Sequence, residues 1–189
     1  MSQYREKLFA PARLNGLELR NRIIRAATFE GKCPNGYPGD ELIALHREVA
    51  QGGVGLTTVA YCAVEANGRV KKEMMYMHEG IRSQVEALTS AVHQAGGKVS
   101  GQMGHCGNFS QNTDFRGFRP LGPSPMINLG GIAAGLPFAG AMSHKDIDHV
   151  VQCFHDAALF MKSAGFDAVE VHFGHGYGLS QFISPRTNR

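Results

Sequence analysis

The sequence lacks several features that mark large classes of proteins. It has no run of about 18 apolar residues, and its beginning, MSQYREKLFAP, has no apolar core of a secretory signal. Basic residues are not clustered and the net charge is only +3, so neither nucleic-acid binding nor a membrane surface is indicated. We therefore expect a cytoplasmic protein whose partner is a small molecule.

Short metal-ligand and disulfide patterns are lacking as well. The four cysteines are scattered, with no CxxC spacing, which is typical of a reducing compartment: Cys33, Cys62, Cys106 and Cys153. His105, His172 and His175 follow predicted strands and would be conceivable zinc ligands. However, Glu30 is the one acidic residue expected near them, and His-x-x-His on a glycine-rich loop is not helical ligand spacing. The sequence therefore predicts no metal site.

What the sequence does contain is a repeated unit of helix, glycine and buried strand. A lone strand is expected first, and three helix–strand units follow it. The expected strands are residues 23–28, 55–61, 98–103 and 168–172. Asp40 is expected to cap the first of these helices, and Ser143 with Asp146 resembles a capping box for the last. Before the first unit, Asn15-Gly16 predicts a tight hairpin turn.

This alternation of strands and helices predicts a parallel α/β sheet with crossover helices. Long loops follow the strands, at residues 62–82 and 104–142, whereas the links from helix to strand are short. That asymmetry favours a (β/α)8 TIM barrel, which carries its working loops at the carboxyl ends of the strands. A doubly wound sheet is the alternative, but no GxGxxG follows the first strand.

Only four strands can be counted, whereas a closed barrel has eight and about 250 residues. We therefore expect residues 1–189 to be a single incomplete domain, the amino-terminal half of a (β/α) barrel with about the first four β/α units.

Polar side chains cluster where two of the expected strands end. His172, His175 and Tyr177 leave the fourth strand on a loop rich in glycine, and Gln102 stands at the end of the third. Chemistry in α/β proteins lies at this edge of the sheet. Two plainer interpretations stay open: a glycine loop with two incidental histidines, and a solvated polar cluster around Gln102.

At these residues the chain resembles the Old Yellow Enzyme family of FMN-dependent NAD(P)H oxidoreductases. The matching motifs run through essentially the whole chain: LFAP (8–11), LRNRI (19–23), GGVGL (52–56), QxxHxG (102–107), AGFD (164–167), VEVHxxHGY (169–177), QFISP (181–185) and NR (188–189). Each motif alone is unspecific, but the set in this order and at these spacings is highly specific.

The resemblance implies a (β/α)8 barrel with FMN at the carboxyl ends of the strands and NADH or NADPH as the reductant. By position, the residues that would border the flavin are Ala26, Ala27, Thr28, Ala60, Gln102 and His172. Gln102 would bind the pyrimidine edge of the ring, since an amide offers one acceptor and two donors.

The resemblance also implies the catalytic residues. His172 and His175 would hold the carbonyl oxygen of an α,β-unsaturated substrate and stabilise the developing enolate. Reduced flavin would deliver a hydride to this activated alkene. Tyr177 would donate the proton, because a phenol with a pKa near ~10 stays protonated at neutral pH.

The chain departs from the family pattern in places. Many relatives carry Ala-Pro-Met where this chain has Ala26-Ala27-Thr28, and an arginine where it has Asn108. In the family, loops after the seventh and eighth strands hold the FMN phosphate, and a basic residue from the fifth strand faces the ring. Residues 1–189 contain none of these elements.

A second hypothesis is therefore a non-catalytic half-barrel, or pseudoenzyme, that binds no flavin. For the isolated chain we expect unpaired strand edges to drive association, for instance into a homo-oligomer. We also expect it to purify colourless, without alkene reductase activity.

Overall fold

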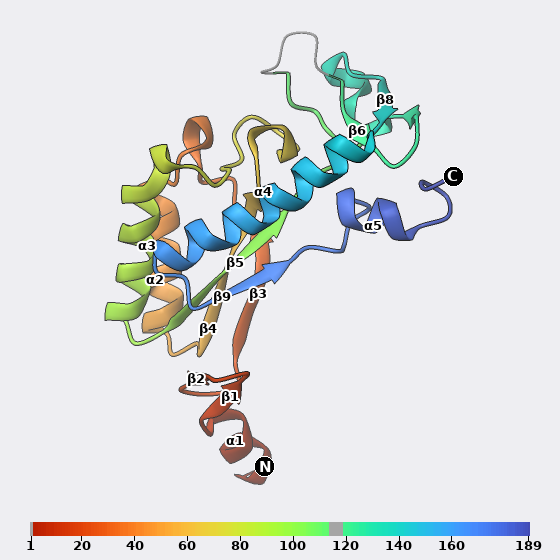
Figure 1. Cartoon of the computed structure of the whole chain (residues 1–189). Helices are drawn as coiled ribbons and strands as arrows, with labels where there is room; N and C mark the ends of the chain where they lie inside the picture. Colours follow the sequence, from red (N-terminus) through yellow and green to blue (C-terminus); the bar gives the residue numbers. More distant parts are fainter. Residues whose placement is uncertain (1, 114–118) are drawn as a thin grey trace.

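The structure, a computed structural model, describes residues 2–113 and 119–189. Its centre is a parallel four-stranded sheet in the order β3-β4-β5-β9 (Figure 1). The strands are β3 (Ile24–Phe29), β4 (Leu56–Ala63), β5 (Lys98–Gly104) and β9 (Ala168–Val171). Each agrees with a predicted strand to within two residues, so the prediction of a parallel α/β sheet is confirmed.

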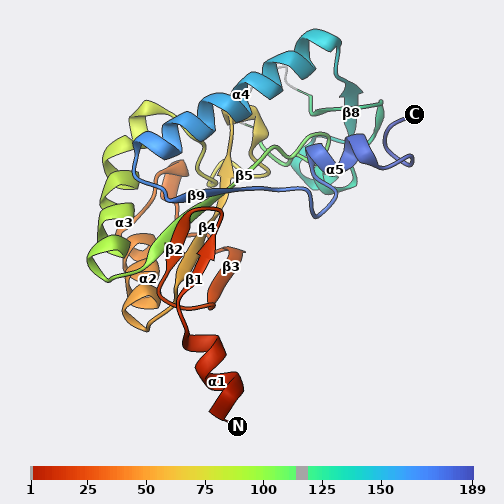
Figure 2. The same ribbon diagram turned by 60° about the horizontal axis from the view of Figure 1, so that its bottom comes forward.

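Three helices pack on one face of the sheet: α2 (Asp40–Gln51), α3 (Arg82–Gln94) and α4 (His144–Ser163) (Figures 1 and 2). Each precedes a strand in the chain, as expected. The Ser143–Asp146 capping box of α4 is present, with both reciprocal bonds. For α2 the prediction is wrong by one residue, since Gly39 is the N-cap and Asp40 lies in the first turn.

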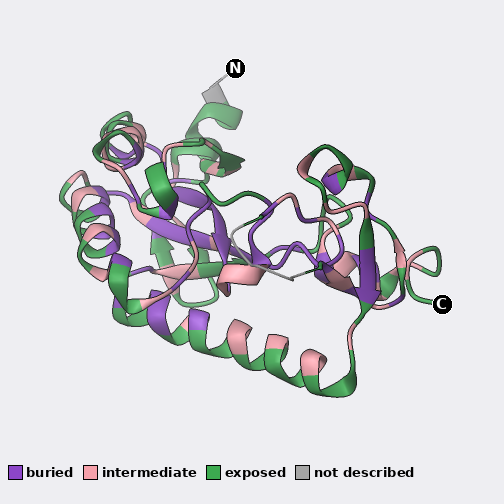
Figure 3. Cartoon of the chain, turned by 90° about the horizontal axis from the view of Figure 1, so that it is seen from above, coloured by how far each residue is buried: buried purple, intermediate pink, exposed green. Residues whose placement is uncertain are grey.

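The face of the sheet that these helices cover is apolar, and we call it the covered face. Its core contains residues from the helices and the strands, among them Leu42, Val59, Leu88, Val99, Met103 and Met161. Gly101 lies here without a side chain, because a Cβ would come within 2.9 Å of Met161. In α4 the buried residues lie only in its second half, so the first half stands away from this core (Figure 3).

The opposite face of the sheet carries polar pairs between neighbouring strands, and we call it the polar face. Thr58 and Ser100 share a hydrogen bond of 2.7 Å, and Gln102 Nε2 donates to Glu170 Oε1 at 2.6 Å. Within the described residues β3 and β9 each pair with one neighbour, so the sheet has two free edges.

The amino-terminal segment lies below the sheet in the view of Figure 1. It consists of α1 (Ser2–Phe9), which the sequence analysis did not predict, and the predicted hairpin of β1 (Ala12–Leu14) and β2 (Leu17–Leu19). The Asn15-Gly16 turn has positive φ at both residues, 43° and 93°. Directly after the hairpin, the Arg20 guanidinium donates to Val54 O at 2.9 Å and to Ala50 O, which ties the segment to the end of α2.

The segment 104–142 is more than the long loop that the sequence suggested. Its described residues form a second small sheet in the order β6-β8-β7, from β6 (Leu121–Gly122), β7 (Met126–Ile127) and β8 (Phe138–Ala141). A short helix near the carboxyl terminus, α5 (Gly178–Ile183), packs beside β6 of this sheet (Figure 1). No helix in the described ranges is both long and apolar enough to cross a membrane.

Candidate active site

The structure brings together the three predicted catalytic side chains. His172 follows β9 directly, and its N–H donates to Met103 O of the neighbouring strand at 2.9 Å. His175 Nδ1 lies 3.1 Å from His172 Nε2. The Tyr177 ring centre lies 5.4 Å from that of His172 and 5.9 Å from that of His175. His175 adopts a positive φ of 57°, which turns the loop back and places the two imidazoles side by side.

An aromatic residue of β4, Tyr61, packs against this group. Its ring lies edge-on to His172 at 6.0 Å and to Tyr177 at 5.7 Å, and its hydroxyl donates to Gly68 O at 3.2 Å. Gly104 makes room for the ring, since a Cβ there would come within 2.5 Å of it. The sequence analysis placed Tyr61 only as a strand residue, and no pattern indicated this contact.

A buried glutamine fixes the histidine loop. Gln181 in α5 is fully buried, and its Nε2 donates to Gly176 O at 2.6 Å and to Cys106 O at 3.0 Å. Its Oε1 accepts from the Asn108 N–H at 2.9 Å. The amide thus joins the loop after β9 to the loop after β5. Gln181 belongs to the motif QFISP, but its positioning role was not predicted from the sequence. That role depends on a contact between segments that are distant in the chain.

The surroundings bias the protonation of these groups. Burial, followed by the charge of His175, lowers the pKa of His172. Burial, together with the nearby Cys106 thiol, raises the pKa of Tyr177. At neutral pH His172 is therefore a neutral imidazole and Tyr177 a protonated phenol. A neutral N–H donor next to a phenol O–H can bind an oxygen and supply a proton.

The residues predicted to border a flavin lie at the carboxyl end of the sheet. Ala60 pairs with Phe29 across β3 and β4, and Ala26 and Thr28 are exposed on β3. Ala27 and Tyr177 pack against one apolar cluster that contains Ala60. The pairing of β4 with β3 and with β5 shifts register near this end. Such irregularities, or β-bulges, are common next to active sites.

Gln102 is half-buried on the polar face and bonded to Glu170. That partner was not anticipated. One bond does not use the whole capacity of an amide, which has two donors and one acceptor. The side chain could therefore still meet the polar edge of a ring. The donor set of Gln102 and His172, with the small side chains of Ala26, Ala27 and Ala60, suits a flat heteroaromatic group such as the isoalloxazine of FMN.

One expectation about the rim is wrong. Glu30 is not the acidic residue near the histidines, because its carboxylate binds Arg25 at 2.7 Å and faces His46 of α2. His105 does not join His172 and His175 in the histidine group; its Nε2 lies 3.1 Å from Glu65 Oε1. Glu65 was not predicted to take part, since it stands in the loop after β4, where no motif was recognised.

Comparison with solved structures establishes the class of fold. The chain superposes on morphinone reductase in complex with tetrahydroNAD with a TM-score of 0.87 and 26% identity, covering 96% of this chain and 53% of that one. It matches the Old Yellow Enzyme from Pichia sp. AKU4542 in fold, with a TM-score of 0.88 at 23% identity, over 97% of this chain and 50% of the other. The four strands are therefore about half of a (β/α)8 barrel.

The family follows from the sequence comparison. The model of the NADH:flavin oxidoreductase / NADH oxidase family matches residues 7–189, and the chain belongs to this family. The resemblance to Old Yellow Enzymes is thereby confirmed, and with it a relation to flavin-dependent oxidoreductases.

Two curated relatives show the range of the family. The chain is 45% identical to the 4,4'-dithiodibutanoate disulfide reductase of Rhodococcus erythropolis, over 96% of this chain and 44% of the relative. It is 31% identical to the NADH oxidase of Thermoanaerobacter brockii, over 96% of this chain and 28% of the relative. The chain thus spans less than half the length of these two relatives.

Proposed function

We propose that residues 1–189 form the amino-terminal half of an FMN-binding barrel that reduces activated alkenes such as α,β-unsaturated carbonyls with electrons from NADH or NADPH. The observation that carries the proposal is the cluster of His172, His175 and Tyr177 at the carboxyl end of β9. Family membership supports flavin as the cofactor. The chain covers only 53% of morphinone reductase and 50% of the Pichia Old Yellow Enzyme, which supports a longer protein.

Ala26, Ala27, Ala60 and Gln102 would border FMN, and the bound cofactor would supply the hydride that the protein's own side chains cannot supply. The role of His172 and His175 is to bind the carbonyl oxygen. In the structure the two rings lie within hydrogen-bond distance of each other, and that bond uses one N–H. For both rings to donate to one oxygen, the substrate must replace this bond.

Tyr177 is the proton donor in this proposal. Its raised pKa keeps the phenol protonated at neutral pH, and its ring stands on Tyr61 beside both imidazoles. The carbon next to the carbonyl acquires negative charge as the oxygen is held by the histidines. A phenol O–H at that carbon neutralises the charge, and general acids of this kind contribute about 10²–10⁴-fold to a rate.

A second candidate reaction is the reduction of an organic disulfide, which the 45% identical Rhodococcus erythropolis relative favours. Two electrons that originate from NADH or NADPH would break the sulfur–sulfur bond and release two thiolates. Tyr177 would then protonate one leaving sulfur, and the solvent the other. The same acid thus serves both substrate classes, whereas an enolate oxygen for His172 and His175 exists only in the alkene reaction.

The experiment uses a chimaeric barrel, in which residues 1–189 are joined to the carboxyl-terminal half of the Rhodococcus erythropolis relative. We expect it to purify yellow and to reduce 2-cyclohexenone with NADH or NADPH. Assays with 4,4'-dithiodibutanoate in parallel separate the two substrate classes. If the chimaera folds but holds no flavin, while the complete relative does, the non-catalytic alternative is correct and the proposal is wrong.

The role of the histidines is tested with phenols, which mimic the enolate oxygen. His172→Ala and His175→Ala in the chimaeric barrel should each weaken the flavin–phenol charge-transfer band. His155→Ala, on the exposed face of α4, is the control and should leave the band unchanged. A charge-transfer band that stays unchanged in both His172→Ala and His175→Ala would contradict the assignment.

A further inference from the structure

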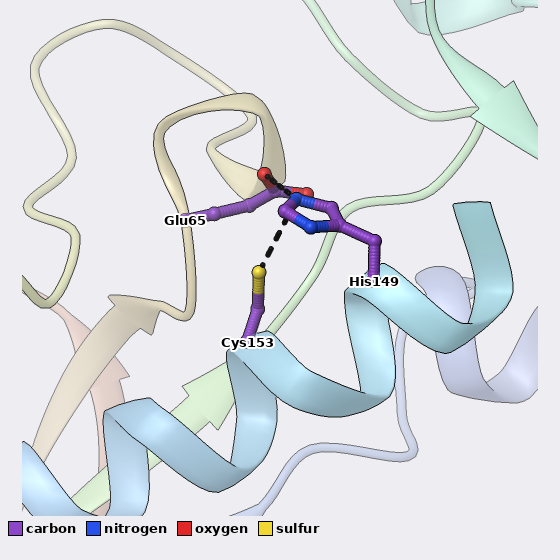
Figure 4. A group of neighbouring side chains, drawn as sticks. All are labelled: Glu65, His149 and Cys153. Atoms are coloured by element: carbon purple, nitrogen blue, oxygen red, sulfur yellow. Dashed lines mark hydrogen bonds and ion pairs between the residues drawn. The ribbon is translucent and has the colours of Figure 1, made fainter. Parts of the chain in front are cut away.

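A second group of ligand-type side chains lies away from the histidine loop. Glu65, from the loop after β4, meets His149 and Cys153 of α4 (Figure 4). His149 Nε2 lies 3.1 Å from Glu65 Oε2 and 3.4 Å from Cys153 Sγ. The two helix residues are four positions apart, so they share one side of α4. One ligand atom from each of the three residues lies within 4.8 Å of the other two.

We propose that Glu65, His149 and Cys153 bind a divalent cation of the zinc type. Carboxylate, imidazole and thiolate are the three ligand classes of protein zinc sites. In tetrahedral geometry at the usual bond lengths, nitrogen and oxygen ligands lie about 3.3 Å apart and nitrogen and sulfur about 3.6 Å. The observed separations of 3.1 and 3.4 Å are therefore close to those of an assembled site.

The carboxylate of this zinc-type site is held in place by His105. The Gly107 N–H donates to His105 Nδ1 at 3.0 Å, so Nε2 carries the ring proton. This Nε2–H donates to Glu65 Oε1 at 3.1 Å, which leaves Oε2 directed to His149. Partners of this kind orient metal ligands, and their loss weakens metal affinity about 10–100-fold.

A buried acceptor next to the site also points to a ligand. Asn67 Oδ1 is buried and has no hydrogen-bond partner among the described residues. Asn67, Glu65, His105 and His149 line one cavity of about 80 Å³, which has room for a water molecule. A cation with three protein ligands keeps a fourth position for water, and that water could donate to Asn67. Asp146 also lines the cavity, and its Oδ2 accepts from the Ser143 N–H and hydroxyl at 2.7 Å each.

The ligand set selects among cations. Imidazole and thiolate favour Zn²⁺ and Co²⁺, whereas Mg²⁺ and Ca²⁺ prefer oxygen ligands. The Cys153 thiol gives its proton to the solvent when it binds. No metal site was predicted from the sequence, because only His105, His172 and His175 were considered as ligands. His149 and Cys153 are separated from Glu65 by more than eighty positions and meet only in the fold.

The test uses Co²⁺ and the 189-residue chain. Cobalt bound through sulfur gives a charge-transfer band in the near ultraviolet, and four-coordinate cobalt gives strong visible bands. Of the four cysteines, which all lie in the described ranges, Cys153 alone is not buried. We expect Cys153→Ser to abolish the charge-transfer band, and Glu65→Gln and His149→Gln to weaken cobalt binding by more than about 100-fold. His105→Gln should weaken it about 10–100-fold.

The control is His155→Gln, which removes a histidine of the same helix with a similar side-chain exposure, 61% against 63% for His149. It should bind cobalt like the wild type. A second readout is alkylation of Cys153, followed by mass spectrometry, which Zn²⁺ should slow and Mg²⁺ should not. No charge-transfer band in the wild type, an unchanged band in Cys153→Ser, or equal alkylation with and without Zn²⁺ would each overturn the proposal.

Discussion

The two faces of the central sheet differ in what holds them together. On the covered face, α2, α3 and α4 bury a continuous apolar core that includes Leu88 and Met161. On the polar face, neighbouring strands are joined by side-chain hydrogen bonds such as Gln102–Glu170. The covered face therefore supplies the stability of the fold, whereas the polar face and the rim above it supply groups for a ligand. A substitution on one face should change stability, and one on the other should change chemistry.

The largest effect on catalysis without an effect on stability is expected for Tyr177→Phe in the chimaeric barrel. Only a hydroxyl is lost, so the packing on Tyr61 stays. Alkene reduction should slow by about 10²–10⁴-fold, because the proton donor is missing. Flavin reduction by NAD(P)H and the melting temperature should hardly change. Stopped-flow measurement of the two half-reactions checks this.

Tyr76→Phe is the matched control, since this tyrosine packs against the same cluster but stacks on His78. It should leave both half-reactions unchanged. Equal slowing of the two half-reactions in Tyr177→Phe would show that Tyr177 acts on flavin binding and not as the acid.

The covered face is tested by Leu88→Ala. Leu88 in α3 is 1% exposed, so its removal leaves a cavity and should lower the free energy of unfolding by about 2–5 kcal/mol. Leu159→Ala in α4, which is 53% exposed, should change it by less than about 0.5 kcal/mol. Urea unfolding measures both. A Leu88 variant as stable as the Leu159 variant would mean that the covered face is not the main source of stability.

A titratable group on the covered face should make this stability depend on pH. His46 of α2 is fully buried, and burial, with Arg25 nearby, lowers its pKa from 6.5 to about 4. Below pH 6.5 the unfolded chain binds the proton and the folded chain does not, so stability falls as the pH drops towards 4. One pKa unit corresponds to about 1.4 kcal/mol, so the loss attributable to His46 is up to about 3 kcal/mol.

The neighbouring Glu30 acts in the opposite sense, because burial raises its pKa and the folded state then binds its proton first. The variant His46→Gln isolates the histidine. Urea unfolding at several pH values should show a smaller decline in acid for this variant than for the wild type. An identical decline would assign the pH dependence to other groups.

The smallest effect is expected on the polar face, for Gln102→Ala in the chimaeric barrel. If the amide meets the flavin edge, its loss should weaken FMN retention by about 1–3 kcal/mol and shift the flavin potential, without releasing all of the flavin. Ser100→Ala, two residues earlier on the same face, is the control. Unchanged flavin affinity and potential in Gln102→Ala would restrict Gln102 to its bond with Glu170.

The covered face was the more predictable of the two. Helical and strand periodicities report which residues face a core, so all four strands and all three covering helices were predicted. The Ser143–Asp146 capping box was predicted because both residues lie within one turn. The helix α1 was missed, since its polar sequence has no apolar stripe, and the strands β6, β7 and β8 are too short to show a period.

The candidate site was predictable only where it is local in the sequence. His172, His175 and Tyr177 fall within six residues and share one loop, so a motif could represent them. Gln181 and Glu65 could not be found this way, because each acts on a segment more than thirty positions away. Their roles depend on how the loops after β4, β5 and β9 meet, which local patterns do not encode.

The order of the strands has a consequence for how the protein is made. In the sheet, β3, β4, β5 and β9 are neighbours in the same order in which they leave the ribosome. Each strand therefore finds its partner already synthesised, and none has to be inserted between two earlier ones. Amino-terminal units fold first during synthesis. The sheet can thus grow at one edge, by one strand at a time. Each of the helices α2, α3 and α4 is synthesised just before the strand that it helps to cover.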